Sequence, residues 1–463
     1  MHLDQDTIVA ISTPPGRGGI GIVRLSGPAS RTIAEPLLKL RHPLAPSQAR
    51  FAEVLDSQSA ETLDEAVVTF FQAPNSYTAE DVVEIAAHGS PVLLDYLLRQ
   101  CIASGARLAE PGEFTQRAFL AGRLDLTQAE AVHDLIESQT LHQARIAAQQ
   151  LGGAISRIIA PIKQQLIALI AALEAGIDFA EDDIDLLPTT AITAQIAAIQ
   201  APLIPLEQSF TYGRILRNGF TLAIVGRPNA GKSSLFNQLV QRDRAIVTAT
   251  PGTTRDLVTE RVSIDGIPID LIDTAGIRTS ADHPADEAES LGIAKSREAM
   301  AAADVILLVV DLAAAATQPP TPEDSTLLAT LHHRPVIIVQ NKSDLLHPQP
   351  LHAKDPQLPH PTIQTSALLG TGIPELRAAI LAKVVTTPPS SDTALLTNLR
   401  QQQSVAAALA ALASAHQAAA SETPHEMLLL DLYEALQSLD ALTGATTSDD
   451  ILNLIFSKFC IGK

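Results

Sequence analysis

One octapeptide constrains the fold of this 463-residue chain more than any other feature of its sequence. Residues 226–233 read GRPNAGKS and match the phosphate-binding P-loop, a pattern that requires a strand before it and a helix after it. The apolar run 220–225 supplies the strand. Strands that alternate with helices imply a parallel sheet with ligands at its carboxyl edge. Three more runs are predicted as strands of this sheet, each ending in a polar residue: Leu271–Asp273, Val305–Asp311 and Val336–Asn341.

The P-loop itself predicts contact with nucleotide phosphates and Mg²⁺. Its glycines allow backbone N–H groups to surround the phosphates, Lys232 can reach the β and γ oxygens, and the Ser233 hydroxyl can bind Mg²⁺. Lys232 is therefore also a candidate catalytic residue. The predicted phosphate-binding residues are Asn229, Ala230, Gly231, Lys232, Ser233 and Ser234.

A second motif predicts that the base is guanine. The Asp344 carboxylate can accept hydrogen bonds from N1–H and from the exocyclic amine of guanine, a pairing that adenine does not offer. An adenine nucleotide would leave this buried charge without a partner, so strong discrimination is expected. The predicted base-binding residues are Asn341, Lys342, Ser343 and Asp344, with Ser366 and Ala367 further along the chain.

Two segments that lie between the P-loop and Asn341 in the sequence predict which groups contact the γ-phosphate and Mg²⁺. In residues 273–276 (DTAG), Asp273 would hold Mg²⁺ through water and the Gly276 amide would contact the γ-phosphate. In residues 252–256 (GTTRD), Thr254 would be the second protein ligand of Mg²⁺. Each motif alone is common in turns, but this order along the chain predicts a GTPase module. The binding residues added here are Gly252, Thr253, Thr254, Asp273, Thr274, Ala275 and Gly276.

The position after Gly276 is occupied by Ile277. Ras-like enzymes place a glutamine there to orient the attacking water, and isoleucine cannot form that hydrogen bond. The P-loop residue Asn229 offers a carboxamide oxygen beside the phosphates, which could bind a monovalent cation. The alternative is that Asn229 only supports the turn of the loop.

The rest of the chain predicts a multidomain protein with α/β and all-α parts. Residues 1–122 mix short β-branched runs with helical stretches, which indicates an α/β domain. Residues 123–219 have helical periodicity, and helical sequence resumes over residues 382–463. The GTPase module, residues 220–381, is therefore predicted to be inserted into a helical domain.

Composition limits where the protein acts and what it binds. Two cysteines are too few for a disulfide framework, no signal peptide is recognisable, and the apolar runs are shorter than the roughly 20 residues of a membrane span. We therefore expect a cytoplasmic protein with no membrane partner. The net charge of −19 opposes non-specific binding to a polyanion, so a nucleic acid would need a local basic patch or a partner protein. Residues 1–50 are rich in arginine, although an ordinary solvated surface explains them better.

Four flanking segments give the sequence a family likeness. Residues 6–24 (DTIVAISTPPGRGGIGIVR), 77–84 (YTAEDVVE), 111–119 (PGEFTQRAF) and 459–463 (FCIGK) surround the GTPase motifs. Together with those motifs they resemble the MnmE (TrmE) family of tRNA-modification GTPases from one end of the chain to the other.

The resemblance implies an N-terminal folate-binding domain, a homodimer formed through that domain, and a heterotetramer with an FAD-dependent MnmG-type partner. Such complexes add an aminomethyl or carboxymethylaminomethyl group to C5 of the wobble uridine of certain tRNAs. The one-carbon unit comes from 5-formyltetrahydrofolate or a related tetrahydrofolate. In that family K⁺ pairs two GTPase modules and activates hydrolysis.

The resemblance also implies residue roles. Glu289 would orient the attacking water. Folate would contact Arg24, Glu84, Arg123 and Lys463, with Arg123 standing where lysine is common. K⁺ would be bound by Asn229, Thr248, Thr250 and Thr253, within a segment that also contains Ala249, Pro251 and Gly252.

The sequence leaves open the role of Cys460 and the choice among three functions. Cys460 lies between Lys458 and Lys463, so it is either a nucleophile with a lowered pKa or a small packed residue. Cys101 lies in an apolar run and is expected in the core. One competing function is an Era-like GTPase switch in ribosome assembly. A weaker alternative is a folate-binding module whose GTPase has lost activity, which predicts hydrolysis insensitive to K⁺. Residues 394–463 show no basic RNA-binding pattern, which favours the tRNA-modification hypothesis.

Overall fold

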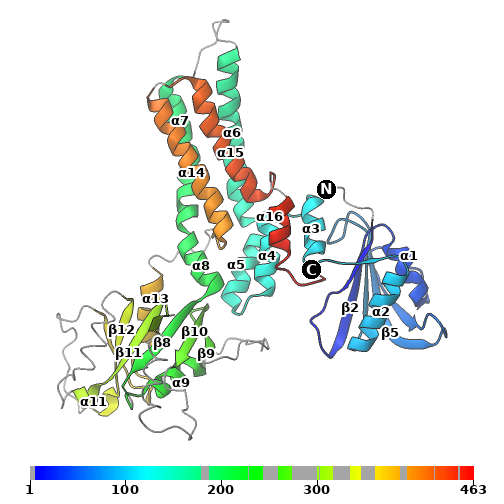
Figure 1. Cartoon of the computed structure of the whole chain (residues 1–463), viewed down its shortest axis with the longest axis horizontal. Coiled ribbons are helices and arrows are strands. Elements are labelled where there is room, and N and C mark those ends of the chain that lie inside the picture. Colours follow the sequence, from blue (N-terminus) through cyan, green and yellow to red (C-terminus); the bar gives the residue numbers. More distant parts are fainter. Residues whose placement is uncertain are drawn as a thin grey trace. The chain divides into compact units, whose positions relative to one another are not determined.

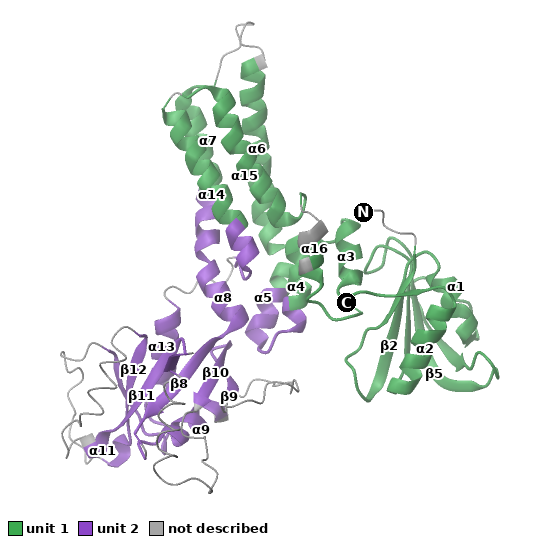
Figure 2. Ribbon diagram, viewed as in Figure 1, with its two compact units in different colours: residues 1–133, 148–200, 404–463 green, residues 134–147, 201–403 purple. Residues whose placement is uncertain are grey.

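The computed structural model describes residues 6–178, 187–227, 229–242, 259–273, 300–301, 303–315, 334–345, 360–385, 394–421, 423–446 and 449–462. These residues divide into two units (Figure 2). The first comprises residues 1–133, 148–200 and 404–463, and the second comprises residues 134–147 and 201–403. Each unit is therefore built from segments that are far apart in the sequence.

A seven-stranded sheet forms the N-terminal part of the first unit, in the order β3-β4-β5-β6-β2-β1-β7. All described pairs are antiparallel except β1 with β7. Helix α2 packs against the sheet through Leu94 and Leu97, which share a buried core with Val23, Leu25 and Ile85. The elements are β1 (Ile8–Ile11), β2 (Gly18–Ser26), α1 (Ser30–Ala34), β3 (Leu38–Leu40), β4 (Ala49–Leu55), β5 (Thr62–Phe71), β6 (Val82–Gly89), α2 (Pro91–Ala103) and β7 (Arg107–Leu108).

Long helices follow this sheet (Figure 1). In α6 (Ala154–Asp178), Leu166, Leu169 and Leu173 are buried at three- and four-residue spacing, the stripe expected of a bundle helix. The Tyr433 hydroxyl of α15 donates to Glu174 of α6 over 2.5 Å, which fixes these two helices side by side. The other helices are α3 (Glu113–Leu120), α4 (Leu126–Ile136), α5 (Leu141–Leu151), α7 (Thr189–Gln208), α14 (Leu399–Ala420), α15 (His425–Thr443) and α16 (Asp449–Phe456).

Two helical stretches, Leu141–Ile177 and Thr189–Asn218, are long and apolar enough to cross a membrane by length and composition alone. Helices in the core of a bundle meet the same criteria, and the buried stripe of α6 is of that kind. The expectation that no segment spans a membrane therefore stays a prediction.

The second unit contains a six-stranded sheet in the order β13-β12-β11-β8-β10-β9. Only β9 runs antiparallel to its neighbour among the described pairs. The central strands are continuous apolar runs because helices cover both faces of such a sheet. The elements are α8 (Phe210–Asn218), β8 (Phe220–Gly226), α9 (Lys232–Arg242), β9 (Thr259–Ile264), β10 (Ile267–Asp273), β11 (Val305–Asp311), α11 (Leu312–Ala315), β12 (Val336–Asn341), β13 (Thr362–Gln364) and α13 (Ile373–Val384).

The predicted fold class is confirmed: an α/β domain, a helical domain and a P-loop module all appear, and the strand predicted over residues 305–311 matches β11. The domain boundaries at residues 122, 219 and 381 stay predictions.

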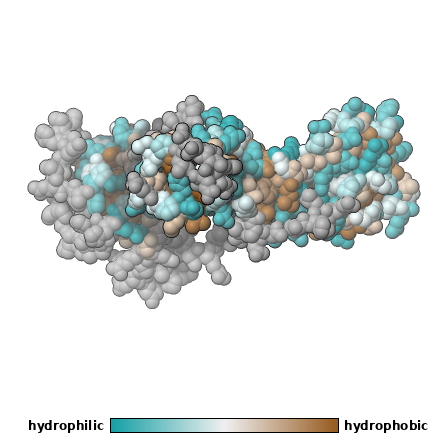
Figure 3. All heavy atoms as spheres, turned by 90° about the horizontal axis from the view of Figure 1, so that it is seen from above, coloured by the Kyte–Doolittle hydropathy of each residue, from teal (hydrophilic) through white to brown (hydrophobic). Residues whose placement is uncertain are grey.

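Three basic residues of the arginine-rich segment 6–50 form ion pairs with carboxylates. Arg24 pairs with Glu84, Arg31 with Glu35, and Lys39 with Glu53. On the face shown in Figure 3, hydrophilic and hydrophobic residues are interspersed. These pairings agree with the interpretation of this region as an ordinary solvated surface.

Candidate functional site

The P-loop connects β8 to α9, as its pattern predicts. The Lys232 ammonium donates to the Gly226 and Arg227 carbonyl oxygens over 2.9 and 2.8 Å, so its side chain lies across the loop. Asn229 has a φ of 63°, in the left-handed region that asparagine tolerates better than most residues. Turn support by Asn229 and cation binding by its carboxamide are compatible with this backbone.

Asn341 joins the phosphate segment to the base segment. Its buried amide donates to the Ala230 carbonyl oxygen over 3.1 Å, and its amide oxygen accepts the Ala367 N–H over 3.0 Å. Gly231 has a φ of 92°, and a Cβ there would lie 2.2 Å from Asn341 Nδ2. Only glycine therefore permits this approach of the two segments.

The predicted base-reading residues also lie together. Ser366 Oγ and Asp344 Oδ1 are 2.5 Å apart, so the serine hydroxyl holds one carboxylate oxygen. Ser343 and Asp344 belong to the short 3₁₀ turn Ser343–Leu345 after β12. A carboxylate has about four acceptor sites, so this single hydrogen bond leaves both oxygens of Asp344 able to accept from the base.

Asp311, at the end of β11, was not among the predicted site residues. Its Oδ2 accepts the Lys342 ammonium over 2.7 Å, and its Oδ1 accepts the N–H groups of Ala313 and Ala314 at the start of α11. Burial alone would raise the pKa of Asp311, but these hydrogen bonds and the Lys342 charge outweigh it and hold the pKa below its usual value. Its place at a strand end was the available sequence signal.

Several predicted ligands fall outside the described residues. For Asp273 the structure gives only the backbone, at the end of β10. Ser233 is exposed in the first turn of α9, and its hydroxyl is a hard oxygen donor of the kind that suits Mg²⁺. The predicted residues outside the description are Thr248, Ala249, Thr250, Pro251, Gly252, Thr253, Thr254, Thr274, Ala275, Gly276, Glu289 and Lys463.

A second candidate site lies in the first unit. Arg24 and Glu84 are directly opposite each other on β2 and β6, and Arg24 Nε donates to Glu84 Oε1 over 2.8 Å. The Gly462 carbonyl oxygen accepts from Arg24 Nη1 over 3.3 Å and from the Ser12 hydroxyl over 3.1 Å. Gly462 of the C-terminal tail, whose Ile461 bridges Pro111, thus lies beside the predicted folate residue Arg24.

The Tyr77 ring contacts both predicted arginines. Its ring centroid is 6.0 Å from Arg24 Cζ and 5.6 Å from Arg123 Cζ, both within cation–π range. Arg123 also donates to the Ser76 carbonyl oxygen. Burial raises the pKa of Tyr77 above its usual value, although its hydrogen bond to Thr115 and both arginine charges oppose that rise. The structure therefore brings Arg24, Glu84 and Arg123 together around a residue that was not predicted as a site residue.

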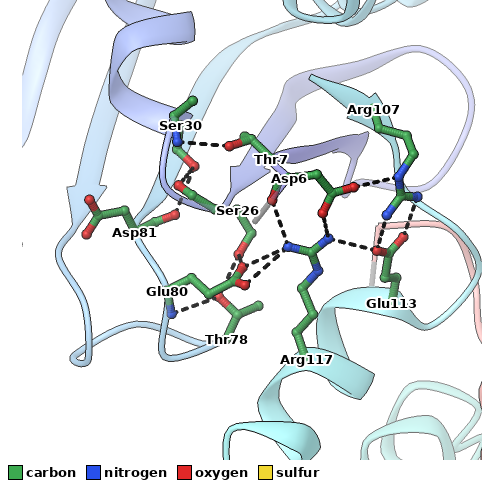
Figure 4. A network of polar contacts seen from close by, with 12 residues as sticks. Asp6, Thr7, Ser26, Ser30, Thr78, Glu80, Asp81, Arg107, Glu113 and Arg117 are labelled. Carbon is green, nitrogen blue, oxygen red and sulfur yellow. Dashed lines mark hydrogen bonds and ion pairs between the residues drawn. The ribbon is translucent and has the colours of Figure 1, made fainter. Parts of the chain in front are cut away.

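A buried ion network supports the loop that carries Tyr77 (Figure 4). Arg117 contacts Glu80 over 3.2 Å, Asp6 over 2.6 Å and Glu113 over 3.0 Å. Burial alone would raise the pKa of Glu113, but hydrogen bonds from Arg107, from the Glu110 N–H and from Arg117 hold it below its usual value. The network joins the chain before β1, the β5–β6 loop and α3, which explains why sequence spacing did not reveal it.

The two cysteines differ. Cys101 is buried in the sheet–helix core, as predicted, and burial raises the pKa of its thiol to about 12. Cys460 is exposed, and its carbonyl oxygen accepts the Gly112 N–H over 3.4 Å. Its exposure does not fit a packed residue and leaves the thiol accessible to a reagent.

Comparison with known proteins covers the whole chain. The N-terminus of the GTP-binding protein TrmE matches residues 7–123, and the MnmE helical domain matches residues 126–460. The tRNA modification GTPase MnmE of Koribacter versatilis is 57% identical, with 100% of both chains covered. The protein of the same description from Chromohalobacter salexigens is 41% identical over 99% of this chain and 98% of that protein. With two domain matches and relatives this similar over their full length, the chain belongs to the MnmE (TrmE) family of tRNA-modification GTPases.

Proposed function

We propose that this protein hydrolyses GTP and couples hydrolysis to the modification of wobble uridine in tRNA. The observation that carries the GTPase part is the Asn341 amide, which binds both Ala230 of the P-loop and Ala367 of the base segment. One buried side chain thereby sets the distance between the phosphate and base subsites. Family membership supports tRNA as the substrate.

Residue roles in hydrolysis follow from position and chemistry. The P-loop amides and Lys232 bind the phosphates, and Lys232 balances charge that develops on them. Ser233, with Thr254 and Asp273, would hold Mg²⁺, which supplies further charge neutralisation when bound. Asn229 would contribute an oxygen ligand to K⁺ in a segment containing Thr248, Thr250 and Thr253. Glu289 would orient the attacking water in place of the glutamine that Ile277 replaces.

The second site would hold a tetrahydrofolate such as 5-formyltetrahydrofolate. A carboxylate such as Glu84 can accept from the donor edge of a pterin, and guanidinium groups attract the carboxylates of the glutamate tail. Arg24 and Glu84 are 18% and 25% exposed, so both remain reachable by a ligand. Lys463 would follow directly from Gly462, which the structure places at Arg24. Cys460, an exposed residue of the same C-terminal tail, is a candidate nucleophile.

An open face of the N-terminal sheet supports the proposed homodimer. Residues alternate between the two faces of a strand, and Val68 and Ile85 point into the core beneath α2. Their neighbours on the other face include Phe51 and Val67, which are directly paired and 45% and 46% exposed. Burying such a row against a second copy would remove apolar surface from water.

The remaining partners follow from family and charge. With a net charge of −19, the chain is poorly suited to hold tRNA alone, which favours a complex with an FAD-dependent MnmG-type partner in the cytoplasm. The alternative, an Era-like switch in ribosome assembly, is favoured by no described contact.

The decisive experiment is mass spectrometry of wobble nucleosides in tRNA from cells that lack the protein. Loss of the C5-aminomethyl or carboxymethylaminomethyl group, restored by the wild-type protein, is expected. Normal wobble nucleosides together with abnormal ribosomal subunits would instead support the Era-like alternative.

A kinetic experiment tests the cation. GTP hydrolysis should be faster in KCl than in NaCl, and Asn229→Ala should reduce that stimulation while largely preserving GTP binding. Equal rates in both salts over a range of protein concentrations would refute the proposed role of K⁺.

A further inference from the structure

Tyr77 presents its ring to two guanidinium groups at once. Arg24 reaches it from the middle of β2, and Arg123 reaches it from the turn after α3. The two arginines differ in the aromatic rings that lie near their guanidinium groups. Arg24 Cζ is also 5.7 Å from the Phe114 ring centroid. Among the described residues, Arg123 has only Tyr77 as an aromatic neighbour. Loss of the Tyr77 ring would therefore affect Arg123 more than Arg24.

The ring is held in place from several directions. The Tyr77 hydroxyl and Thr115 Oγ1 are 2.9 Å apart, which ties the ring to α3. The next residue, Thr78, shares a 2.6 Å hydrogen bond with Ser26 of β2. The Ser76 hydroxyl donates to the Glu80 carbonyl oxygen over 2.5 Å. With both flanking residues fixed, Tyr77 is a rigid platform rather than an adaptable surface side chain.

The charges around this platform are unequal. Arg24 forms an ion pair with Glu84, so its charge is largely balanced. Arg123 is exposed, and within the part of the chain that the structure describes no carboxylate pairs with it. One cation beside the ring is thus free to meet an anion from solution.

We propose that Tyr77 is a positioning residue that holds Arg24 and Arg123 as a pair with separate tasks. The balanced Arg24–Glu84 pair faces the hydrogen-bonding edge of a pterin, and Arg123 binds a carboxylate of the glutamate tail. This assignment rests on the proposed folate site and adds to it the residue that sets the spacing of its cations.

Calorimetry with 5-formyltetrahydrofolate tests the assignment on the full-length protein. Tyr77→Leu removes the ring and is expected to weaken binding about tenfold, the effect of losing a partly desolvated cation–π contact. Tyr77→Phe keeps the ring, loses only the hydroxyl bond to Thr115, and should keep the affinity within about threefold of wild type.

Tyr96→Leu is the matched control, because Tyr96 lies on α2 and its hydroxyl accepts the Ser57 N–H. This variant is expected to bind with wild-type affinity. Equal binding by Tyr77→Leu and wild type, or equal losses in the Leu and Phe variants, would overturn the proposal.

A measurement without folate tests the role of Tyr77 independently of whether the site binds folate. Phenylglyoxal reacts with accessible guanidinium groups, and peptide mass spectrometry gives the labelling rate of each arginine. Tyr77→Leu should raise the rate at Arg123 several-fold and the rate at Arg24 less, while Tyr77→Phe should leave both near wild type. A wild-type protein that does not bind the folate refutes the ligand, whereas unchanged labelling at Arg123 in Tyr77→Leu refutes the role of Tyr77.

Discussion

In the nucleotide site, the described contacts join residues at the carboxyl ends of neighbouring strands or in the loops that follow them. Gly226 ends β8, Asp311 ends β11 and Asn341 ends β12. The site around Tyr77 draws instead on β2, the β5–β6 loop, β6, the turn after α3 and the C-terminal tail. One site is assembled by a single sheet edge, and the other only by the folding of the N-terminal sheet, the turn after α3 and the C-terminal tail.

This difference predicts how each site responds to substitution. Backbone pairing between parallel strands positions the residues at the sheet edge. Replacing one nucleotide-binding side chain should therefore change nucleotide binding or hydrolysis and leave the fold intact. The Tyr77 site depends on a buried ion network and on a docked C-terminal tail. Substitutions of residues that do not contact the ligand should therefore also weaken ligand binding at this site. The predictions below test that contrast in order of decreasing effect.

The largest effect is expected for Asp344→Asn. An amide at this position can no longer accept both donors of guanine, but it can donate to the second carbonyl of xanthine. The preference for GTP over XTP should change by about 10⁴-fold, the discrimination typical of a site built to hydrogen-bond its ligand. Competition calorimetry with the two nucleotides measures it, and Glu375→Gln on the exposed side of α13 is the control. A retained GTP preference would show that Asp344 does not read the base.

Arg117→Leu should destabilise the first unit. The Arg117 side chain is 7% exposed, and its loss would leave Asp6, Glu80 and Glu113 without one shared counter-charge. Breaking such a buried pair typically costs about 3–5 kcal/mol in the free energy of unfolding. Urea unfolding measures the loss, and the matched control Arg99→Leu, in an exposed helix pair with Asp95, should cost about 1 kcal/mol or less. Equal costs for the two variants would mean that the network contributes no more than a surface ion pair.

The same network gives a pH dependence with a definite sign. The pKa values of Asp6 and Glu113 lie below 3.8 and 4.5, their usual values, so their contribution to stability is present above those values. It is lost as the pH falls through the lowered pKa values of the folded protein. The difference in urea midpoint between wild type and Arg117→Leu should therefore be full near neutral pH and shrink below about pH 4. A constant difference from pH 7 to pH 3 would contradict this.

The smallest effect is expected for Gly462→Ala. Gly462 has a φ of 95°, and a Cβ there would lie 2.6 Å from the Ile11 carbonyl oxygen, so the tail must shift away from Arg24. Folate binding measured by calorimetry should weaken about tenfold, the loss of roughly one hydrogen bond to a charged group. Gly105→Ala is the control, because Gly105 also has a positive φ of 105° but nothing within 4 Å of its Cβ position. Unchanged folate affinity in Gly462→Ala would show that the tail does not shape this site.

Much of the P-loop module could be predicted from the chain because its motifs are local. A buried parallel strand is a continuous apolar run, and the residues after it lie at the ligand edge whatever the rest of the protein does. Asn341, Asp344 and Ser366 were assigned to one base-binding set in this way, and in the structure Ser366 contacts Asp344. The contact of Asn341 with Ala230 of the P-loop was not predicted. Asp311 was missed because its role depends on Lys342, a residue that follows a different strand, β12.

The N-terminal site could not be predicted by such local reasoning. Arg24, Glu84 and Arg123 were singled out only through a family resemblance, since isolated arginines on a sheet are more often ordinary surface charges. Tyr77 belonged to a recognised segment, but nothing in its spacing predicted that its ring contacts two cations. The roles of Glu289, Lys463 and the residues from Thr248 to Thr254 stay predictions, because these residues lie outside the described structure.

The sequence by itself determined the fold class, the nucleotide chemistry and the family, because strand runs and phosphate loops are encoded within a few consecutive residues. Only the tertiary structure decided that the Tyr77 ring contacts both Arg24 and Arg123, that Arg117 joins three carboxylates, and that the tail at Gly462 reaches Arg24. The physical reason is distance along the chain. Antiparallel pairing brings residue 24 to residue 84, and tail docking brings residue 462 to residue 24. Contacts of that range leave no periodic trace in the sequence.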